Sequence, residues 1–353
     1  MRSRVCSGLT VVLALGTAAY TRAQTRVILM VADGAGAGHW TIGVHSIGNL
    51  AVQQFPVVGL IDTRGANHIV TESAAAATAY STGVQTFPGA VGVGPDSQPR
   101  ETVLEAAKTR GLSTGLVTTT YLTDATPAAF ASHLAGRRNP VEIAAQMAVA
   151  GVDVLLGGGR VVFERVMTRD SVLLLDAMRR RYTYVSSADS LKALRLNRVR
   201  ALLGLFAEGE MDLGFARSPS LADMARAALE VLDQNPRGFF LLVENEETDT
   251  QAHRNQPYDV IAAEMVTFDD AVHVALEYQE RHPETLLVVL GDHETGGLAL
   301  QPDSLGAVVA VYTTTGHTAE LVPVFARGPR AERFAGIITN SRVGELLHAA
   351  VRR

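Results

Sequence analysis

Short apolar runs bounded by turn residues recur along the chain and alternate with longer segments of helical periodicity. The runs are continuous and rich in Val and Leu, as strands covered on both faces are, and the clearest span residues 27–32, 113–118, 152–156, 238–243 and 286–290. Helical segments between them include residues 101–110, 141–150, 221–234 and 261–281. This alternation predicts an α/β fold, a three-layer sandwich with a central, mainly parallel β-sheet flanked by helices on both faces.

The first 23 residues differ from the rest of the chain. Arg2 and Arg4 precede an apolar stretch over residues 5–19, and the segment ends on the small residue Ala23, a pattern typical of a secretory signal peptide. The apolar stretch is short for a membrane span, and an uncleaved N-terminal anchor is the alternative. We expect an exported protein, periplasmic or secreted, without a stable membrane span.

The composition bounds what residues 24–353 can be. The only cysteine, Cys6, lies in the predicted signal peptide, so the mature protein is expected to have no disulfide. Removal of three arginines with that segment takes the net charge from −5 to −8, and no long basic run suggests a nucleic-acid partner. Neither a repeat nor a low-complexity linker divides residues 24–353, which predicts a single domain, although residues 160–220 are less regular.

Three predicted strands end on residues that can bind metal ions. Asp33 follows the first strand, Glu244 follows the strand at 238–243, and Asp292 and His293 follow the strand at 286–290. One acidic residue at a strand end carries little weight, because such residues are common caps. The carboxyl ends of parallel strands meet at one edge of a sheet, where open α/β folds bind their ligands. The three strand ends together therefore predict a site at that edge.

Two further histidines add to this candidate site. Asp249 and His253 are four residues apart, which on a helix places both side chains on one face. Such a pair is commonly a solvated helix face, and a metal site is the alternative. His317 lies in a polar turn before the apolar run at 321–326. A donor set of His, Asp and Glu without Cys suits zinc and magnesium better than soft metals.

Ser73 is the candidate nucleophile. It stands at the start of an alanine-rich run that favours a helix. A plain N-cap is the simpler interpretation of a serine there. The same position would favour a phosphoserine, since free N–H groups and the helix dipole attract an anion. No histidine stands beside Ser73 in the sequence, so a metal ion would have to activate it.

In chain order, these segments resemble the alkaline phosphatases. The matches run from about residue 27 to the last predicted helix, and they are Val31-Ala32-Asp33-Gly34, Thr71-Glu72-Ser73-Ala74-Ala75, Thr123-Asp124-Ala125-Thr126-Pro127, Arg137, residues 238–244, Asp249 with His253, Asp292-His293 and Gly316-His317-Thr318. Each motif alone is modest, but their joint order and spacing are specific. The resemblance implies one alkaline phosphatase-like catalytic domain over residues 24–353.

The resemblance also implies two zinc ions and one magnesium ion. The implied ligands are Asp249, His253 and His317 for one zinc, Asp33, Asp292 and His293 for the second zinc, and Asp124, Thr126 and Glu244, bridged by Asp33, for magnesium. Ser73 would be the nucleophile, held by the second zinc. Arg137, thirteen residues after Asp124, would bind two phosphate oxygens through its planar guanidinium, a contact that lysine cannot make.

The implied activity is hydrolysis of small phosphate monoesters through a phosphoserine at Ser73, with release of inorganic phosphate, broad specificity and a role in phosphate scavenging. A phosphodiesterase of the same superfamily and a non-catalytic exported phosphate-binding protein are the alternatives. Only 23 residues separate His293 from His317, which indicates a short member without the crown insertion and leaves the expected homodimer open. Thr250 stands where some members carry a basic or aromatic residue, so we expect an altered phosphate affinity.

Overall fold

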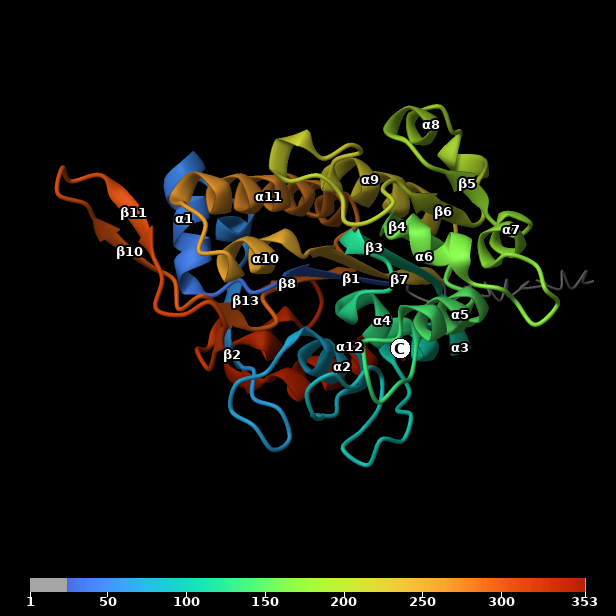
Figure 1. The fold of residues 1–353 in the computed structure, drawn as a ribbon, viewed down its shortest axis with the longest axis horizontal. Helices are drawn as coiled ribbons and strands as arrows, with labels where there is room; N and C mark the ends of the chain where they lie inside the picture. Colours follow the sequence, from blue (N-terminus) through green and yellow to red (C-terminus); the bar gives the residue numbers. More distant parts are fainter. Residues whose placement is uncertain (1–23, 353) are drawn as a thin grey trace, which may run out of the picture.

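A ten-stranded sheet forms the centre of the computed structural model, which describes residues 24–352 (Figure 1). From one edge to the other the strands are β14 (Gly336–Thr339), β2 (Val57–Asp62), β13 (Val322–Arg327), β8 (Thr285–Leu290), β1 (Thr25–Ala32), β7 (Gly238–Asn245), β3 (Ser113–Tyr121), β4 (Val154–Gly158), β6 (Leu202–Leu205) and β5 (Thr183–Val185). Within the described part of the chain, only β13 runs against its neighbours in this sheet. The predicted, mainly parallel sheet is confirmed.

Helices cover both faces of the sheet (Figure 1). Those that pack on one face are α2 (Ser73–Thr82), α3 (Val103–Thr109), α4 (Ala125–Ala131), α5 (Pro140–Ala150), α6 (Arg160–Arg165), α7 (Leu174–Arg179) and α12 (Asn340–Val351). Those that pack on the other are α1 (Ala37–Ile47), α8 (Ala188–Lys192), α9 (Leu221–Leu232), α10 (Glu247–His253) and α11 (Tyr258–Arg281). The three-layer sandwich predicted from the sequence is therefore confirmed.

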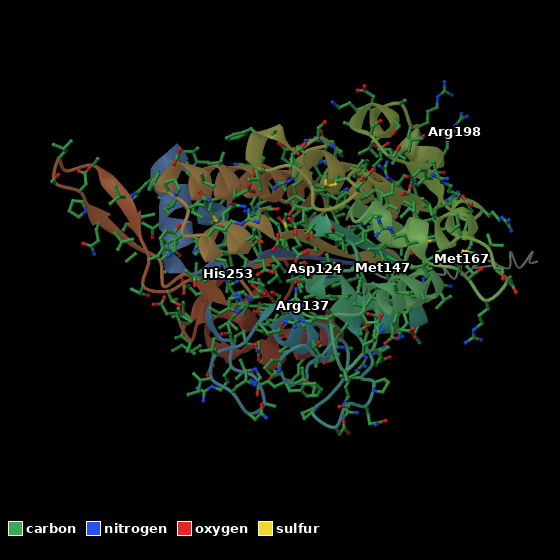
Figure 2. All side chains as sticks on the ribbon, in the orientation of Figure 1. Asp124, Arg137, Met147, Met167, Arg198 and His253 are labelled. Carbon is green, nitrogen blue, oxygen red and sulfur yellow. The ribbon has the colours of Figure 1, made fainter. Side chains whose placement is uncertain are left out.

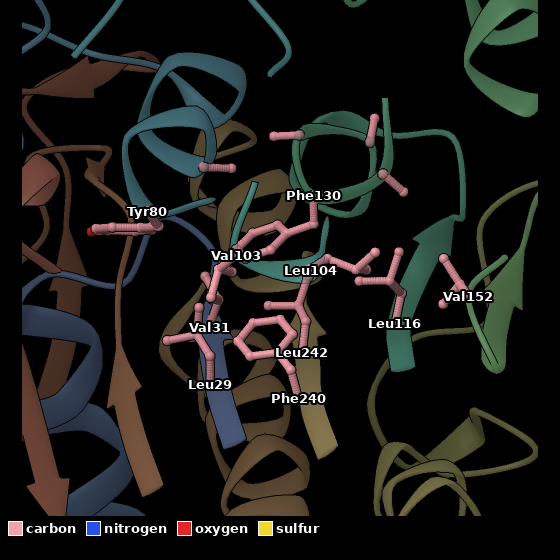
Figure 3. Packing of buried hydrophobic residues seen from close by; sticks show 14 of the residues in the cluster. Leu29, Val31, Tyr80, Val103, Leu104, Leu116, Phe130, Val152, Phe240 and Leu242 are labelled. Carbon is pink, nitrogen blue, oxygen red and sulfur yellow. The ribbon is translucent and has the colours of Figure 1, made fainter. Parts of the chain in front are cut away.

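Alternate side chains of the central strands point into two separate cores. Along β1, Leu29 and Val31 belong to one buried cluster, whereas Ile28 and Met30 belong to the other. Figure 3 shows the first cluster, in which residues of β1 and β7 pack beneath the helices. Because these strands are buried on both faces, each position is apolar, which explains their continuous apolar runs in the sequence.

The predicted elements are present, and their ends differ by at most three residues from the structure. The irregular stretch at 160–220 contains elements of only three to six residues, including α6, α7, β5, α8 and β6. Elements this short show less than two helical turns or a few strand positions, so no periodicity can be read from them. Short 3-10 helices lie at Ala51–Gln54, Leu196–Arg198, Gly214–Ala216 and Ala331–Phe334.

Between the second and third predicted histidine ligands, the chain forms two small antiparallel pairs. A hairpin of β10 (Ala299–Pro302) and β11 (Val308–Val311) projects from the body, and β9 (Glu294–Thr295) pairs with β12 (His317–Thr318) (Figure 1). The predicted signal peptide lies outside the described residues. Within residues 24–352, no helix has the length and apolar character needed to cross a membrane.

Candidate active site

Three neighbouring strands of the sheet carry the acidic residues that the sequence singled out. β1 lies between β7 and β8, and Val31 of β1 pairs with Glu244 of β7. Asp33 follows β1 directly, while Asp292 and His293 follow the last residues of β8. The strand ends converge on one edge of the sheet, as the sequence predicts.

One group of candidate metal ligands consists of Asp249, His253 and His317, whose ligand atoms lie within 4.8 Å of one another. Nε2 of His253 is 3.2 Å from Asp249 Oδ2, and Nε2 of His317 is 3.4 Å from Asp249 Oδ1. The Nδ1 atoms of the two histidines lie 2.5 and 2.9 Å from the backbone oxygens of Thr315 and Thr71, respectively. Because a carbonyl oxygen only accepts hydrogen bonds, each Nδ1 is the donor, and Nε2 is the ring nitrogen left to coordinate a metal ion beside Asp249.

A second group consists of Asp33, Asp292 and His293, which are all buried. Nε2 of His293 lies 3.2 Å from Asp292 Oδ2 and 3.5 Å from Asp33 Oδ1. The same nitrogen is 3.3 Å from Oγ of Ser73, so the fold supplies the neighbouring histidine that the local sequence lacks. The backbone N–H of Gly34, a residue with a φ of 71°, donates to Asp292 Oδ1 at 2.9 Å and fixes that carboxylate.

Oxygen donors alone form the third predicted group. Asp124, at the N-cap of α4, and Thr126 line one cavity together with Glu244 and Asp33. Glu244 Oε2 accepts a hydrogen bond from Thr118 Oγ1 at 2.6 Å. Burial raises the pKa of Glu244, and the buried Oγ1 of Thr126 lies close enough to that carboxyl to offset part of the rise, but among the described residues this hydroxyl makes no hydrogen bond of normal geometry. Carboxylates and a hydroxyl without nitrogen or sulfur are donors that suit a hard cation such as magnesium.

The three groups meet around one cavity of about 170 Å³. Figure 2 shows Asp124, Arg137 and His253 in the same central region of the molecule. The cavity is lined by Asp33, Ser73, Asp124, Ala125, Thr126, Arg137, Glu244, Glu246, Asp249, His253 and His317. Asp292 and His293 are linked to it through Asp33 and Ser73. The structure thus brings every predicted site residue to one place.

Two carboxylates hold the guanidinium of Arg137 at this cavity. One of its terminal nitrogens donates to Asp124 Oδ1 at 2.6 Å, and the other donates to Glu72 Oε2 at 3.0 Å. Burial opposes ionisation of the guanidinium, but Asp124 and Glu72 raise the pKa of Arg137 above its ordinary value. The arginine is therefore a fixed positive charge at the rim of an acidic cavity.

The N-cap of α2 differs from the residue that the sequence suggested. Ser73 is not the N-cap; Glu72 is, and its carboxylate accepts the N–H groups of Ala75 and Ala74 at 2.7 and 3.1 Å. These two amides are thus not free for an anion, whereas the helix dipole still favours one. Glu72 Oε1 also accepts the N–H of Gly89 at 2.8 Å. An acidic residue directly before a helix former is a capping signal that the sequence does contain.

Several acidic residues of the site are buried close together, although their negative charges would repel one another. Burial raises the pKa of Glu244 to about 8 and the pKa of Asp292 to about 6. The pKa of Asp33 lies well above its usual value because of burial and of the neighbouring Asp292. Burial lowers the pKa of His293 to about 3, which keeps its imidazole neutral. A neutral histidine among crowded carboxylates is a donor set whose repulsion a divalent cation relieves.

Comparison with known proteins gives a consistent answer. A model of the alkaline phosphatase family matches residues 25–310. The chain belongs to the alkaline phosphatase family. The alkaline phosphatase of Escherichia coli (strain K12) is 31% identical and is matched over 92% of this chain and 85% of its own length. The alkaline phosphatase from the Antarctic bacterium TAB5 is 30% identical, with a TM-score of 0.84 over 94% of this chain and 99% of that one.

This member of the family is a phosphatase enzyme, as the resemblance in the sequence implies. It corresponds in extent to the TAB5 enzyme, and the β10–β11 hairpin is the only pairing that projects between β9 and β12 in the described chain. A mutant of the TAB5 enzyme, 29% identical over the same shares of both chains, carries Mg bound in its M3 site. The family's dependence on metals thus agrees with the clustered donors seen here.

One further acid in the cavity was not assigned a role from the sequence. Glu246 lies between the predicted ligands Glu244 and Asp249, and its side chain lines the cavity beside them. The sequence contains a signal for it, since the stretch from Glu244 to Asp249 holds four acids in six residues. Spacing alone could not show which of them face the cavity.

Proposed function

We propose that this phosphatase hydrolyses phosphate monoesters through a phosphoserine formed at Ser73. The observation that carries the proposal is the place of the Ser73 hydroxyl. Its Oγ lies 3.3 Å from Nε2 of His293, at a cavity that also contains the fixed cation Arg137. A nucleophile, a metal-type donor group and a phosphate-binding cation therefore surround one small volume, which is what phosphoryl transfer requires.

The donor atoms fit two zinc ions and one magnesium ion. Asp249, His253 and His317 would hold one zinc; Asp33, Asp292 and His293 the second; and Asp124, Thr126, Glu244 and Asp33 the magnesium. Buried oxygens left without a hydrogen bond among the described residues, Asp33 Oδ1, Asp292 Oδ2 and Thr126 Oγ1, support cation binding there. When bound, such ions lower the pKa of nearby hydroxyl groups and neutralise negative charge on the phosphate.

Ser73 and Arg137 carry the transfer itself. The guanidinium of Arg137 binds two non-bridging phosphate oxygens and orients phosphorus toward Ser73. The Oγ of Ser73 loses its proton to solvent and attacks in line, the bond from phosphorus to the ester oxygen breaks, and the leaving alkoxide takes up a proton from solvent and departs as the alcohol. Water then attacks the phosphoserine, inorganic phosphate leaves, and the Ser73 hydroxyl is restored. The positive end of the α2 dipole, where Ser73 is the first residue, favours the negative charge at each stage.

The oxygen-only group favours a monoesterase over a phosphodiesterase. Monoesters carry one more negative charge than diesters, and Asp124, Thr126 and Glu244 supply a place for a third cation beside the phosphate. A phosphate-binding protein without catalysis would need no nucleophile next to the donor groups. The small cavity offers few specific contacts for a leaving group, which supports broad specificity and phosphate scavenging.

The remaining expectations about this protein also stand as proposals. Residues 1–23 would serve as a signal peptide for export to the periplasm or the medium, and residues 24–353 would form one catalytic domain. The mature protein would act on small phosphate monoesters, with no nucleic-acid partner and no stable membrane span, and could form a homodimer. Mass spectrometry of the exported protein and analytical ultracentrifugation test the cleavage site and the oligomeric state.

Hydrolysis of p-nitrophenyl phosphate at mildly alkaline pH tests the proposed activity. Turnover should vanish after chelation and return when zinc and magnesium are added together. Bis-p-nitrophenyl phosphate, measured in parallel, should be cleaved much more slowly. Rapid diester cleavage beside negligible monoester cleavage would instead establish a phosphodiesterase, and phosphate binding without turnover of either ester would establish a binding protein.

A further inference from the structure

Glu246 presents a carboxylate to the cavity that none of the three ligand groups uses. It directly precedes α10, yet its side chain makes no capping hydrogen bond to that helix, which is the usual task of an acid at this place. Its side chain instead lines the cavity together with Asp124, Thr126 and Glu244. A capping role therefore does not account for this residue.

One oxygen of Glu246 is held and the other is left open. Thr250, one turn further along α10, donates its hydroxyl to Glu246 Oε1 at 2.5 Å. The backbone N–H of Glu246 is fixed in turn by Thr119 Oγ1 at 3.0 Å. Oε2 is shielded from solvent and has no hydrogen-bond partner among residues 24–352. The carboxylate is thus oriented by its neighbours with one buried acceptor oxygen unsatisfied.

Two other oxygens at the same cavity are also buried without a hydrogen-bond partner in the part of the chain that the structure describes. Oδ1 of Asp33 and Oγ1 of Thr126 are buried without a hydrogen bond in the described chain, and each residue is only 2% exposed. Burying an unpaired oxygen is costly, and burying an unpaired charge costs far more. A cation between these oxygens removes both costs at once.

The neighbouring Glu247 shows that this arrangement is specific. Its side chain is also buried, but Oε2 accepts a hydrogen bond from Gln251 at 2.8 Å. It does not line the cavity, and Arg217 is among the groups that act on it. The two adjacent glutamates thus differ: Oε2 of Glu247 is paired with a protein donor away from the cavity, whereas Oε2 of Glu246 is unpaired within residues 24–352 and its side chain lines the cavity.

We propose that Glu246 is an additional ligand for the hard divalent cation of the oxygen-only group, with Thr250 as the residue that positions it. The inference rests on the magnesium site in the proposed function and adds a carboxylate to it. Magnesium affinity depends on the number and charge of the oxygen ligands and on how rigidly they are held. A fourth carboxylate fixed by a hydroxyl should therefore bind Mg²⁺ more tightly than Asp33, Asp124 and Glu244 alone.

Calorimetric titration of Mg²⁺ into the zinc-loaded protein tests this directly. Glu246→Gln should weaken Mg²⁺ binding by at least about 10-fold, because loss of even an outer partner of a metal ligand costs about 10- to 100-fold in affinity. Glu247→Gln, which removes the same charge from the adjacent buried position, should bind Mg²⁺ as the wild type does. Thr250→Val should give a smaller loss of affinity, and Thr250→Ser, which keeps the hydroxyl, should restore it.

Thermal unfolding separates a ligand from a residue that only supports the fold. As a ligand, Glu246 destabilises the metal-free protein, so Glu246→Gln should leave its melting temperature unchanged or raise it, while shrinking the increase that Mg²⁺ produces. A lower melting temperature without metal, together with an unchanged Mg²⁺ affinity, would overturn the proposal and leave the phosphatase function intact. Wild-type protein that hydrolyses the monoester but binds no Mg²⁺ would overturn the magnesium site itself.

Discussion

Glu72 joins the start of α2 to the phosphate-binding arginine, and its replacement by alanine would act on both. Its carboxylate accepts the N–H groups of Ala74, Ala75 and Gly89 and also binds Arg137 at 3.0 Å. Ser73 is the first residue of the helix that this carboxylate caps. Glu72→Ala should therefore reduce both stability and catalysis. The loss of stability comes mainly from the N–H contacts, and the loss of catalysis comes from the contact with Arg137.

The expected loss of stability follows from those contacts. Loss of an N-cap costs about 1 kcal/mol. The N–H of Gly89, left without its acceptor, adds roughly 1–2 kcal/mol. The Arg137–Glu72 ion pair is partly exposed, with side-chain exposures of 29% and 21%, and adds less than about 1 kcal/mol. The total is about 2–4 kcal/mol, and with an unfolding entropy of about 2.1 cal/mol/K per residue this lowers the melting temperature of a chain of this size by roughly 3–6 °C.

The expected loss of activity comes from Arg137. Without Glu72 its guanidinium keeps only the contact with Asp124 and can turn away from the phosphate. Misplacement of a positioning group by about 1 Å costs up to roughly 100-fold, so kcat/KM should fall by about 10- to 100-fold. The KM for p-nitrophenyl phosphate and the inhibition constant of inorganic phosphate should both rise.

Glu105→Ala provides the matched control. Glu105 also belongs to a capping arrangement, with its Oε2 accepting the N–H of Thr102 at 2.8 Å, but it lies on α3 and does not line the cavity. It should lower stability by about 1 kcal/mol and leave kcat/KM unchanged. If Glu72→Ala behaved like this control, with lower stability and wild-type kinetics, the proposed positioning of Arg137 would be refuted.

Further predictions concern the nucleophile, the metals and a buried acid remote from the site. Ser73→Ala should lower kcat by at least about 1,000-fold at unchanged metal content, and retention of a tenth of the activity would exclude Ser73 as nucleophile. Chelation of the folded protein should lower its melting temperature by about 5 °C or more, reversibly on adding zinc and magnesium. Burial raises the pKa of Asp269 to about 6, so its ionisation weakens the folded state as pH rises from 3.8 through 6. In Asp269→Asn this pH-dependent loss of stability should disappear from urea titrations, because an amide does not ionise. The Asn oxygen can still accept the N–H of Ala51, so the hydrogen bond is kept.

The fold and most of the site could be predicted because the positions of the apolar runs and of the site residues follow from the geometry of a buried parallel sheet. Strands buried on both faces must be apolar throughout, so β1, β7 and β8 stand out in the sequence. Parallel strands end on the same edge, so the positions of Asp33, Glu244 and Asp292 at strand ends are enough to place them together. The i,i+4 spacing of Asp249 and His253 is realised on α10. Local pattern and tertiary placement agree at each of these positions.

The features of the site that the sequence could not predict depend mainly on contacts between residues that are far apart in the chain. Glu72 is next to Ser73 in the chain, but its contact with Arg137 spans 65 residues and requires the loop before α5 to fold back. Glu246 and Glu247 are indistinguishable by type and neighbours, and only the turn into α10 decides which one faces the cavity. His293 and Ser73 are 220 residues apart, so no local motif could reveal their contact.

The cavity is a place where stability and function oppose one another. Without cations, the pKa of Glu244 at about 8 and that of Asp292 at about 6 mean that folding must either protonate these carboxyls or bury their charge near neutral pH. Either alternative is costly, whereas the surrounding sheet and both cores are apolar and well buried. The apolar cores therefore supply the stability that offsets the cost of clustering these acids. The clustered acids form a cation site that exists only in the folded chain. It follows that metal loading should contribute to folding as well as to catalysis, and that variants which neutralise Glu244 or Asp292 should gain stability only when the metals are removed.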